Sequence, residues 1–220
     1  MAVITISRQF GAGGRTLGEM VAEKLDYTFL DDAVIQELSE RVGVTKESIA
    51  DMEKNGRGFF PTILSSMLGR SYMERLAKEK SGYIDEVIYV DKIQEVINDL
   101  AAQDNVVLLG RGSQFILSGH PEAIHVLLVA DKEQRIKFMQ RKYNLSESQA
   151  YHEVQAGEKR RKHVYAKMGC TNYDDPHSYH MVLNMSRLSI EEAASQMILL
   201  AEHKQHEPII PSSRHHKANG

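Results

Sequence analysis

The chain has 220 residues, of which 42% are hydrophobic and 26% charged, so it is long and apolar enough to bury a sizeable core. Its formal net charge of -3 argues against binding to long nucleic acid but leaves small anionic ligands open. The single cysteine, Cys170, excludes an internal disulfide framework and a multi-cysteine zinc site. Without a signal-peptide pattern or an apolar run of membrane-spanning length, we expect a cytoplasmic protein with no membrane partner.

Strand-like and helix-like segments alternate along the chain, which predicts a mainly parallel sheet covered by helices on both faces. Five strands are expected, at residues 2–7, 27–30, 105–110, 123–130 and 180–185. A helix is expected over residues 15–25, and residues 32–103 have an interrupted helical pattern. Capping-box patterns predict three further helices, which begin near Lys132, Glu147 and Ile190.

A glycine-rich turn joins the first expected strand to the first expected helix, in the stretch ITISRQFGAGGRTLGEMVAEKL. Strand, turn and helix N-terminus direct backbone N–H groups and the helix dipole at one point, where a di- or triphosphate can bind. A turn without a ligand is the simpler alternative, but the strand and helix context favours a nucleotide site. The candidate ATP-binding residues are Gly11, Ala12, Gly13, Gly14, Arg15, Thr16 and, from a later helix, Arg135.

The turn admits two alignments with the standard pattern GxxxxGK[ST], in which the lysine reaches the outer phosphates and the hydroxyl ligates magnesium. In the first, residues 14–16 replace GK[ST], and Gln9 stands where the first glycine belongs. In the second, GAGGRT lies over the GAGKGT of nucleoside monophosphate kinases, so that Gly14 replaces the lysine. Both stay open, and in each Arg15 lies beside the turn and can grip phosphate bidentately. Thr16 is the candidate magnesium ligand.

Four blocks of the sequence resemble the cytidylate kinase-like family of P-loop proteins: ITISRQFGAGGRTLGEMVAEKLDYTFLDD, VVLLGRGSQFIL, EKRRKHVY and DPHSYHMVLNMSRLSIEEA. The likeness runs from the first strand to about Leu200, and the family's own opening pattern also carries an arginine after paired glycines. The resemblance implies a P-loop NTPase-type three-layer α/β sandwich with a five-stranded parallel sheet, a helical insertion that binds substrate, and an arginine-rich lid.

The resemblance also implies a division of the chain into functional parts. One kinase domain is expected over residues 1–204, with the insertion at about 32–103 and the lid at about 146–176. Residues 205–220 are expected to form a flexible tail.

Charged residues follow two of the expected strands, at the edge where ligands bind in open α/β sheets. Asp31 and Asp32 follow the second strand, and each also suits a helix N-cap, so the structural and functional roles are equally supported. Arg111 follows the third strand, where it can clamp a monophosphate. The related kinases have GRD there, and Gly112 replaces their acidic residue, which argues against cytosine recognition. We assign Asp31, Asp32 and Arg111 to acceptor binding.

The segment from Arg135 to Lys167 is rich in arginine and lysine. Taken alone, such a run favours a solvated helix face. The phosphate turn reverses this preference, because cations around the moving phosphoryl group promote its transfer. We therefore predict that Arg160 and Arg161 are catalytic residues of the lid, together with Arg15 at the turn. Arg135 is expected to hold the base or the α-phosphate of ATP.

Two further features carry weaker signals. His177 and His180 lie close together in DPHSYH, but without third and fourth ligands they do not predict a metal site. Phe59 and Phe60 lie within the insertion and suit either stacking on an acceptor base or a dimer contact. The homodimer is favoured because both rings are fully apolar.

These features together predict an ATP-dependent phosphotransferase that resembles cytidylate kinase. It would move the γ-phosphoryl group of Mg-ATP to a small acceptor, with CMP or dCMP preferred, and Mg²⁺ would be the cofactor. Two alternatives stay open. One is a nucleotide-binding regulatory module without turnover, suggested by the missing lysine and by Gly112. The other is a kinase for a non-nucleotide acceptor.

Overall fold

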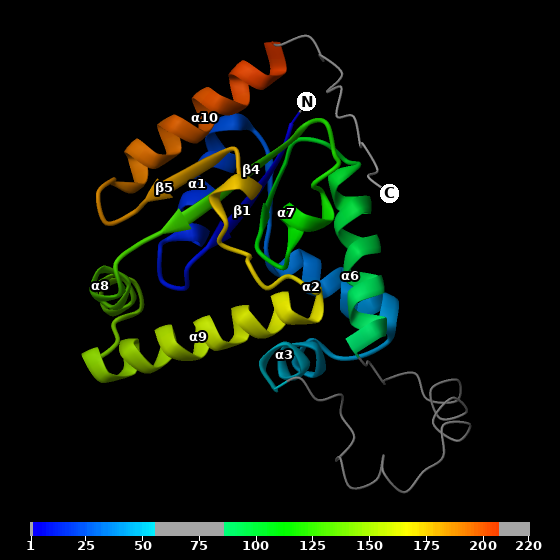
Figure 1. Ribbon diagram of the computed structural model, residues 1–220, viewed down its shortest axis with the longest axis horizontal. Coiled ribbons are helices and arrows are strands. Elements are labelled where there is room, and N and C mark those ends of the chain that lie inside the picture. The colour runs from blue at the N-terminus through cyan, green and yellow to red at the C-terminus, as the bar shows by residue number, and fades with distance from the viewer. Residues whose placement is uncertain (1, 56–85, 207–220) are drawn as a thin grey trace, which may run out of the picture.

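The computed structural model describes residues 2–55 and 86–206, which form a five-stranded sheet between two layers of helices (Figure 1). The strands are β1 (Val3–Arg8), β2 (Thr28–Leu30), β3 (Val106–Leu109), β4 (Ala123–Val129) and β5 (Met181–Asn184). Their order is β2-β3-β1-β4-β5, and every pairing is parallel. The three-layer α/β sandwich predicted from the sequence is therefore confirmed.

The helices follow the expected alternation with the strands. They are α1 (Gly14–Leu25), α2 (Asp32–Val42), α3 (Lys46–Asn55), α6 (Glu86–Ala101), α7 (Ser113–Ile116), α8 (Lys132–Tyr143), α9 (Glu147–Lys167) and α10 (Ile190–His206). Helix α10 includes the first two residues of the predicted tail. The predicted base-stacking or dimer contact of Phe59 and Phe60 lies outside the described residues, as do residues 207–220. None of the described helices is both long and apolar enough to cross a membrane.

The predicted capping boxes form at two of three helices. Ser146 Oγ accepts the backbone N–H of Gln149 before α9, and the Gln149 side chain accepts that of Ser146. Ser189 and Glu192 exchange the same pair of bonds before α10. Asp131 precedes α8, but its side chain makes no capping hydrogen bond. All three helices nevertheless begin at the residues that the patterns predict.

The two faces of the sheet are covered by different helices (Figure 1). Ile4 and Ile6 of the central strand β1 pack into one apolar cluster with α1 and α10. Val3 belongs to the other cluster, with α2, α3 and α6. The carboxyl ends of β1, β2 and β3 therefore lie next to each other at one edge of a rigid sheet, where open α/β sheets bind ligands.

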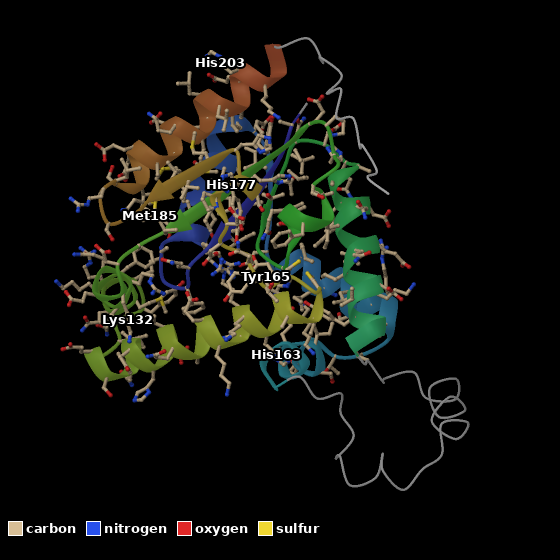
Figure 2. The ribbon with its side chains drawn as sticks, viewed as in Figure 1. Lys132, His163, Tyr165, His177, Met185 and His203 are labelled. Atoms are coloured by element: carbon tan, nitrogen blue, oxygen red, sulfur yellow. The ribbon has the colours of Figure 1, made fainter. Side chains whose placement is uncertain are left out.

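Helix α9 runs along this edge of the sheet (Figure 1). Ala150 and Val154 pack on α8 and on Phe10 of the turn after β1. Gly157 lies so close to the Phe10 ring that any side chain at this position would overlap the ring. Tyr165 lies on the side of α9 that faces the sheet, whereas His163 lies on the side toward α3 (Figure 2). The segment predicted as the lid thus consists of α9 and the turns that follow it.

His125 is a buried histidine in β4, with 5% of its surface exposed. Its Nδ1 lies 2.8 Å from Thr5 Oγ1, and its backbone N–H donates to His180 Nδ1 at 3.0 Å. Burial, followed by the nearby His180 and Lys204, lowers the pKa of His125 from 6.5 to about 4, and His120 adds a smaller effect in the same direction. The histidine is therefore neutral in the folded protein at neutral pH.

We expect this histidine to make the fold sensitive to acid. The unfolded chain binds a proton at His125 near pH 6.5, but the folded chain does so only near pH 4, so stability is lost as the pH falls through this window. The free energy of unfolding should fall by about 3 kcal/mol over this range of pH. Urea unfolding between pH 7.5 and 4 measures it, and His125→Asn, which cannot titrate, should show a flatter pH dependence. Equal slopes for the two proteins would contradict the prediction.

Candidate functional site

A cavity of about 550 Å³ opens at the carboxyl ends of β1, β2 and β3. This volume is in the range of small-molecule sites, which are about 300 to 1,000 Å³. Most of the site residues predicted from the sequence lie in its wall: Gly11, Gly13, Gly14, Arg15, Thr16, Asp31, Arg111, Arg160 and Arg161. Ala12 instead borders a smaller neighbouring hollow. Asp32 begins α2, and only its backbone is described.

The turn after β1 has the backbone that an anion site requires. Gly11 and Gly13 have φ angles of 86° and 84°, and Gly14 is the first residue of α1. The Gln9 side chain fixes the turn by accepting the backbone N–H of Ala130 at 2.9 Å. No acidic side chain lies in the first turn of α1, so the positive end of the helix dipole is not offset there. The turn is therefore suited to bind phosphate oxygens through backbone N–H groups.

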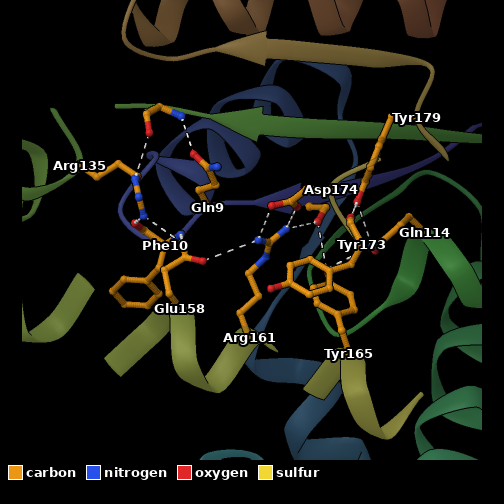
Figure 3. A network of polar contacts seen from close by, with 12 residues as sticks. Gln9, Phe10, Gln114, Arg135, Glu158, Arg161, Tyr165, Tyr173, Asp174 and Tyr179 are labelled. Atoms are coloured by element: carbon orange, nitrogen blue, oxygen red, sulfur yellow. Dashed lines mark hydrogen bonds and ion pairs between the residues drawn. The ribbon is translucent and has the colours of Figure 1, made fainter. Parts of the chain in front are cut away.

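Arg135 does not line the cavity. Figure 3 shows its side chain directed toward Phe10 and Glu158. Its Nε donates to the carbonyl oxygen of Ala130 at 3.1 Å. One terminal nitrogen donates to the carbonyl oxygen of Phe10 at 3.1 Å and to Glu158 at 3.0 Å. These donors join the turn to α8 and α9, and a contact of Arg135 with ATP stays a prediction.

Arg15, Asp31 and Arg111 meet on the floor of the cavity. Nη2 of Arg15 lies 2.5 Å from one Asp31 oxygen, and Nη1 of Arg111 lies 3.3 Å from the other. Asp31 precedes α2 but makes no side-chain capping bond, so of its two predicted roles the helix cap is not used. Its carboxylate instead joins the phosphate turn to the end of β3.

Arg111 is held from the protein side as well. Its Nε lies 3.3 Å from Glu53 Oε1, and Glu53 also accepts the hydroxyl of Tyr89 at 2.8 Å. Burial alone lowers the pKa of Arg111, but the charges of Glu53 and Asp31 outweigh it and raise the pKa above its ordinary value. Two carboxylates thus already face the cation that was expected to clamp a monophosphate.

Gly112, which stands where the related kinases have an acidic residue, is in the left-handed region of the backbone and lies next to the end of α9. Its φ is 72°, a conformation that side chains rarely adopt. A side chain at this position would also overlap the sulfur of Met168 at the end of α9. An acidic residue at this position would therefore require the Met168 side chain to move.

Arg161 belongs to a network between α9, β1 and the turn after α9 (Figure 3). Both terminal nitrogens pair with the Asp174 carboxylate, and one lies 3.4 Å from Ser7 Oγ. The rings of Tyr165 and Tyr173 stack on each other and lie beside the guanidinium, with centroids 5.3 and 4.7 Å away. Burial alone lowers the pKa of Arg161, but the Asp174 hydrogen bonds outweigh it and raise the pKa above its ordinary value.

The basic residues between Arg135 and Lys167 include some that line or adjoin the cavity and others that are exposed to solvent. Arg160 lines the cavity, and its guanidinium carbon lies 5.9 Å from the centroid of the Phe10 ring. Only 8% of the Arg161 side chain is exposed. Lys142, Lys159 and Lys162 are exposed on α8 and α9. The solvated-face interpretation thus describes the lysines but not the two arginines.

Several residues of the cavity and its network were missed from the sequence. They include Arg8, Phe10, Glu53, Asp174 and Tyr165. Arg8 had a detectable signal, because it is a charged residue at the end of a buried strand, directly before the phosphate turn. The others depend on contacts with distant segments of the chain.

Residues 3–187 match the cytidylate kinase-like family. Among solved structures, an uncharacterized protein from Eubacterium ventriosum ATCC 27560 is similar with a TM-score of 0.62 and 18% identity, covering 92% of this chain and 99% of that chain. A shikimate kinase from Acinetobacter baumannii in complex with shikimate has a TM-score of 0.51 and 18% identity, covering 94% and 96%. Both likenesses concern the fold. The search of curated proteins found no match.

Proposed function

The chain belongs to the cytidylate kinase-like family, and from this premise we propose that it is an ATP-dependent phosphotransferase. One observation carries the proposal: a single cavity unites a phosphate turn at the start of α1 with Asp31 and Arg111 at the ends of β2 and β3. ATP would place its outer phosphates at the turn. An acceptor oxygen would attack the γ-phosphorus from the side of Asp31, the bond to the bridging oxygen would break, and ADP would leave.

Magnesium fits this site as a companion of ATP. Mg²⁺ keeps several waters and takes few protein oxygens when it binds with phosphates. Thr16, in the first turn of α1, lines the cavity and offers its hydroxyl oxygen, and Asp31 lies in the same wall. When bound, magnesium would neutralise charge on the β- and γ-phosphates. Thr16 would thus hold the ion beside the turn.

We assign residues 32–103 to acceptor binding, and residues 146–176 to a lid over the phosphates. Arg160 and Arg161 support this assignment because both line the cavity from α9. A cation next to the transferring group stabilises its developing charge, as such cations do in phosphoryl transfer. The proposed part of these arginines is therefore catalytic.

The preferred acceptor is CMP or dCMP, following the family. A hydroxyl-bearing, non-nucleotide acceptor is the second candidate, and the carboxylates around Arg111 favour it. Asp31 and Glu53 would repel a phosphate dianion, whereas a carboxylate such as Asp31 can orient a hydroxyl group and accept its proton. The shikimate kinase with a similar fold is a protein named for such an acceptor.

Release of ADP from Mg-ATP, measured with a panel of acceptors, tests the proposal. The panel should contain CMP, dCMP, UMP and AMP beside shikimate and gluconate. Stimulation by the cytidine nucleotides supports the first candidate, and stimulation by a hydroxy acid supports the second. ATP binding without turnover on any acceptor would favour the regulatory module.

Mg-ATP is expected to raise the unfolding temperature of the protein, because a ligand that binds only the folded state stabilises it. At a concentration a hundred times the Kd the gain is about 2.7 kcal/mol, which corresponds to roughly 5 to 10 °C for a chain of this size. Thermal unfolding with Mg-ATP measures it, and MgCl₂ alone is the control. No shift at millimolar Mg-ATP would contradict the nucleotide site.

A further inference from the structure

Arg8 is the last residue of β1, and its side chain lines the cavity between α1 and the end of β3. Its Cγ would be 3.0 Å from a Cβ placed on Gly14. Its guanidinium fills the space that any side chain at Gly110 would need. The first residue of α1 and the residue after β3 thus both leave room for this arginine because both are glycines.

None of the described residues is a counter-ion for Arg8 alone. Within residues 2–55 and 86–206, it takes part in no hydrogen bond or ion pair. Asp31 attracts it, but the oxygens of Asp31 are paired with Arg15 and Arg111. Burial lowers the pKa of Arg8 below its ordinary value, and the like charges of Arg111 and Arg161 act in the same direction. A partly buried cation without a partner is costly, and a bound anion would relieve that cost.

We propose that Arg8 contacts the outer phosphates of the nucleotide and takes the place of the P-loop lysine that this chain lacks. In the standard pattern that lysine reaches the outer phosphates from the first turn of the helix. Here Arg8 reaches the same region from the end of the strand, and a long side chain on Gly14 would collide with it. A planar guanidinium can hold a phosphate through two parallel hydrogen bonds. The inference rests on the proposed function.

Arg15 fits this part less well than Arg8 does. Its guanidinium is paired with Asp31 at 2.5 Å, and 44% of its side chain is exposed. Arg8 lies between the phosphate turn and the Arg111 side of the cavity, where the transferred group would pass from donor to acceptor. The two arginines therefore have different roles, since Arg15 orients Asp31 and Arg8 binds phosphate.

Binding of Mg-ATP, AMP and inorganic tripolyphosphate to wild type and to Arg8→Gln tests the proposal by calorimetry. The variant should bind ATP and tripolyphosphate about tenfold to a hundredfold more weakly, because one hydrogen-bonded charge is lost. AMP, which lacks the outer phosphates, should bind almost as before. Arg8→Lys should recover part of the loss, since it keeps the charge. Lys159→Gln, an exposed change on α9, is the matched control and should have no effect.

The ligand-free Arg8→Gln protein should unfold at the same temperature as wild type or higher, because an unpartnered cation leaves the interior. Equal weakening of ATP and AMP, together with a lower unfolding temperature, would show a structural role and overturn the proposal. Unchanged ATP binding would overturn it too. Wild-type protein that binds tripolyphosphate through Arg8 but not ATP would refute the proposed function and leave the Arg8 assignment standing. Wild-type binding of neither ligand would refute both.

Discussion

Replacement of Asp31 by asparagine should lower kcat by about a hundredfold to ten-thousandfold if the acceptor is a hydroxyl group, the range expected when a catalytic base is lost. The carboxylate is 8% exposed and lies between Arg15 and Arg111, at the boundary between the phosphate turn and the acceptor side. Asparagine keeps the shape but removes the charge, so Arg15 and Arg111 lose the carboxylate that they share. Steady-state release of ADP measures the effect.

The same substitution separates the two candidate acceptors. A monophosphate oxygen attacks without losing a proton to the enzyme. Asp31→Asn would then lower kcat only about tenfold, because it would disturb the positions of Arg15 and Arg111 but remove no base. Asp99→Asn breaks the exposed ion pair with Arg41 on α2 and is the control, because such surface pairs contribute little. An unchanged kcat for Asp31→Asn would remove Asp31 from the reaction altogether.

Substitution of Glu53 should change the kinetics of the reaction in a different way from substitution of Asp31. It lies behind Arg111 and also accepts the Tyr89 hydroxyl, so it does not face the reacting atoms. Comparing kcat with KM for the two positions therefore distinguishes a group at the chemistry from one that holds its neighbour.

The parts of the fold that were predicted correctly have local signals. The strand β1 is an alternating β-branched run, and the glycines that follow it open directly onto a helical pattern. The starts of α8, α9 and α10 were found because a capping pattern spans only four residues. Parallel order then places the strand ends at one edge, so Asp31 and Arg111 were expected there and line one cavity.

What the sequence did not reveal depends on partners far away in the chain. The contact between the Arg135 side chain and the carbonyl oxygen of Phe10, 125 positions earlier, was not predicted. Gly112 stands where the related kinases have an acidic residue, and its closeness to Met168, 56 positions later, has no local signal. The P-loop pattern places its lysine on the helix, whereas Arg8 reaches the cavity from the end of the preceding strand.

Two roles for Arg161 lead to different expectations. As a lid residue it would contact the transferring phosphoryl group. As a structural residue it ties α9 to the turn at Asp174 and to Ser7 of β1. Loss of the ion pair with Asp174 alone should cost about 1 to 3 kcal/mol of unfolding free energy in either case. A single Arg161 variant therefore loses both the contact with the phosphoryl group and the ion pair with Asp174. A second variant is required to separate the two losses.

Arg161→Ala should lower kcat by about thirtyfold to a thousandfold and weaken ATP binding much less, because a contact made only in the transition state is lost. Asp174→Asn breaks the same ion pair but leaves the guanidinium in the cavity wall, so it should lower the unfolding temperature similarly and keep most of kcat. Lys142→Ala, an exposed change on α8, should alter neither quantity. If Arg161→Ala and Asp174→Asn lose kcat equally, Arg161 only fixes α9 in place, and the phosphoryl group is stabilised by other cations of the cavity.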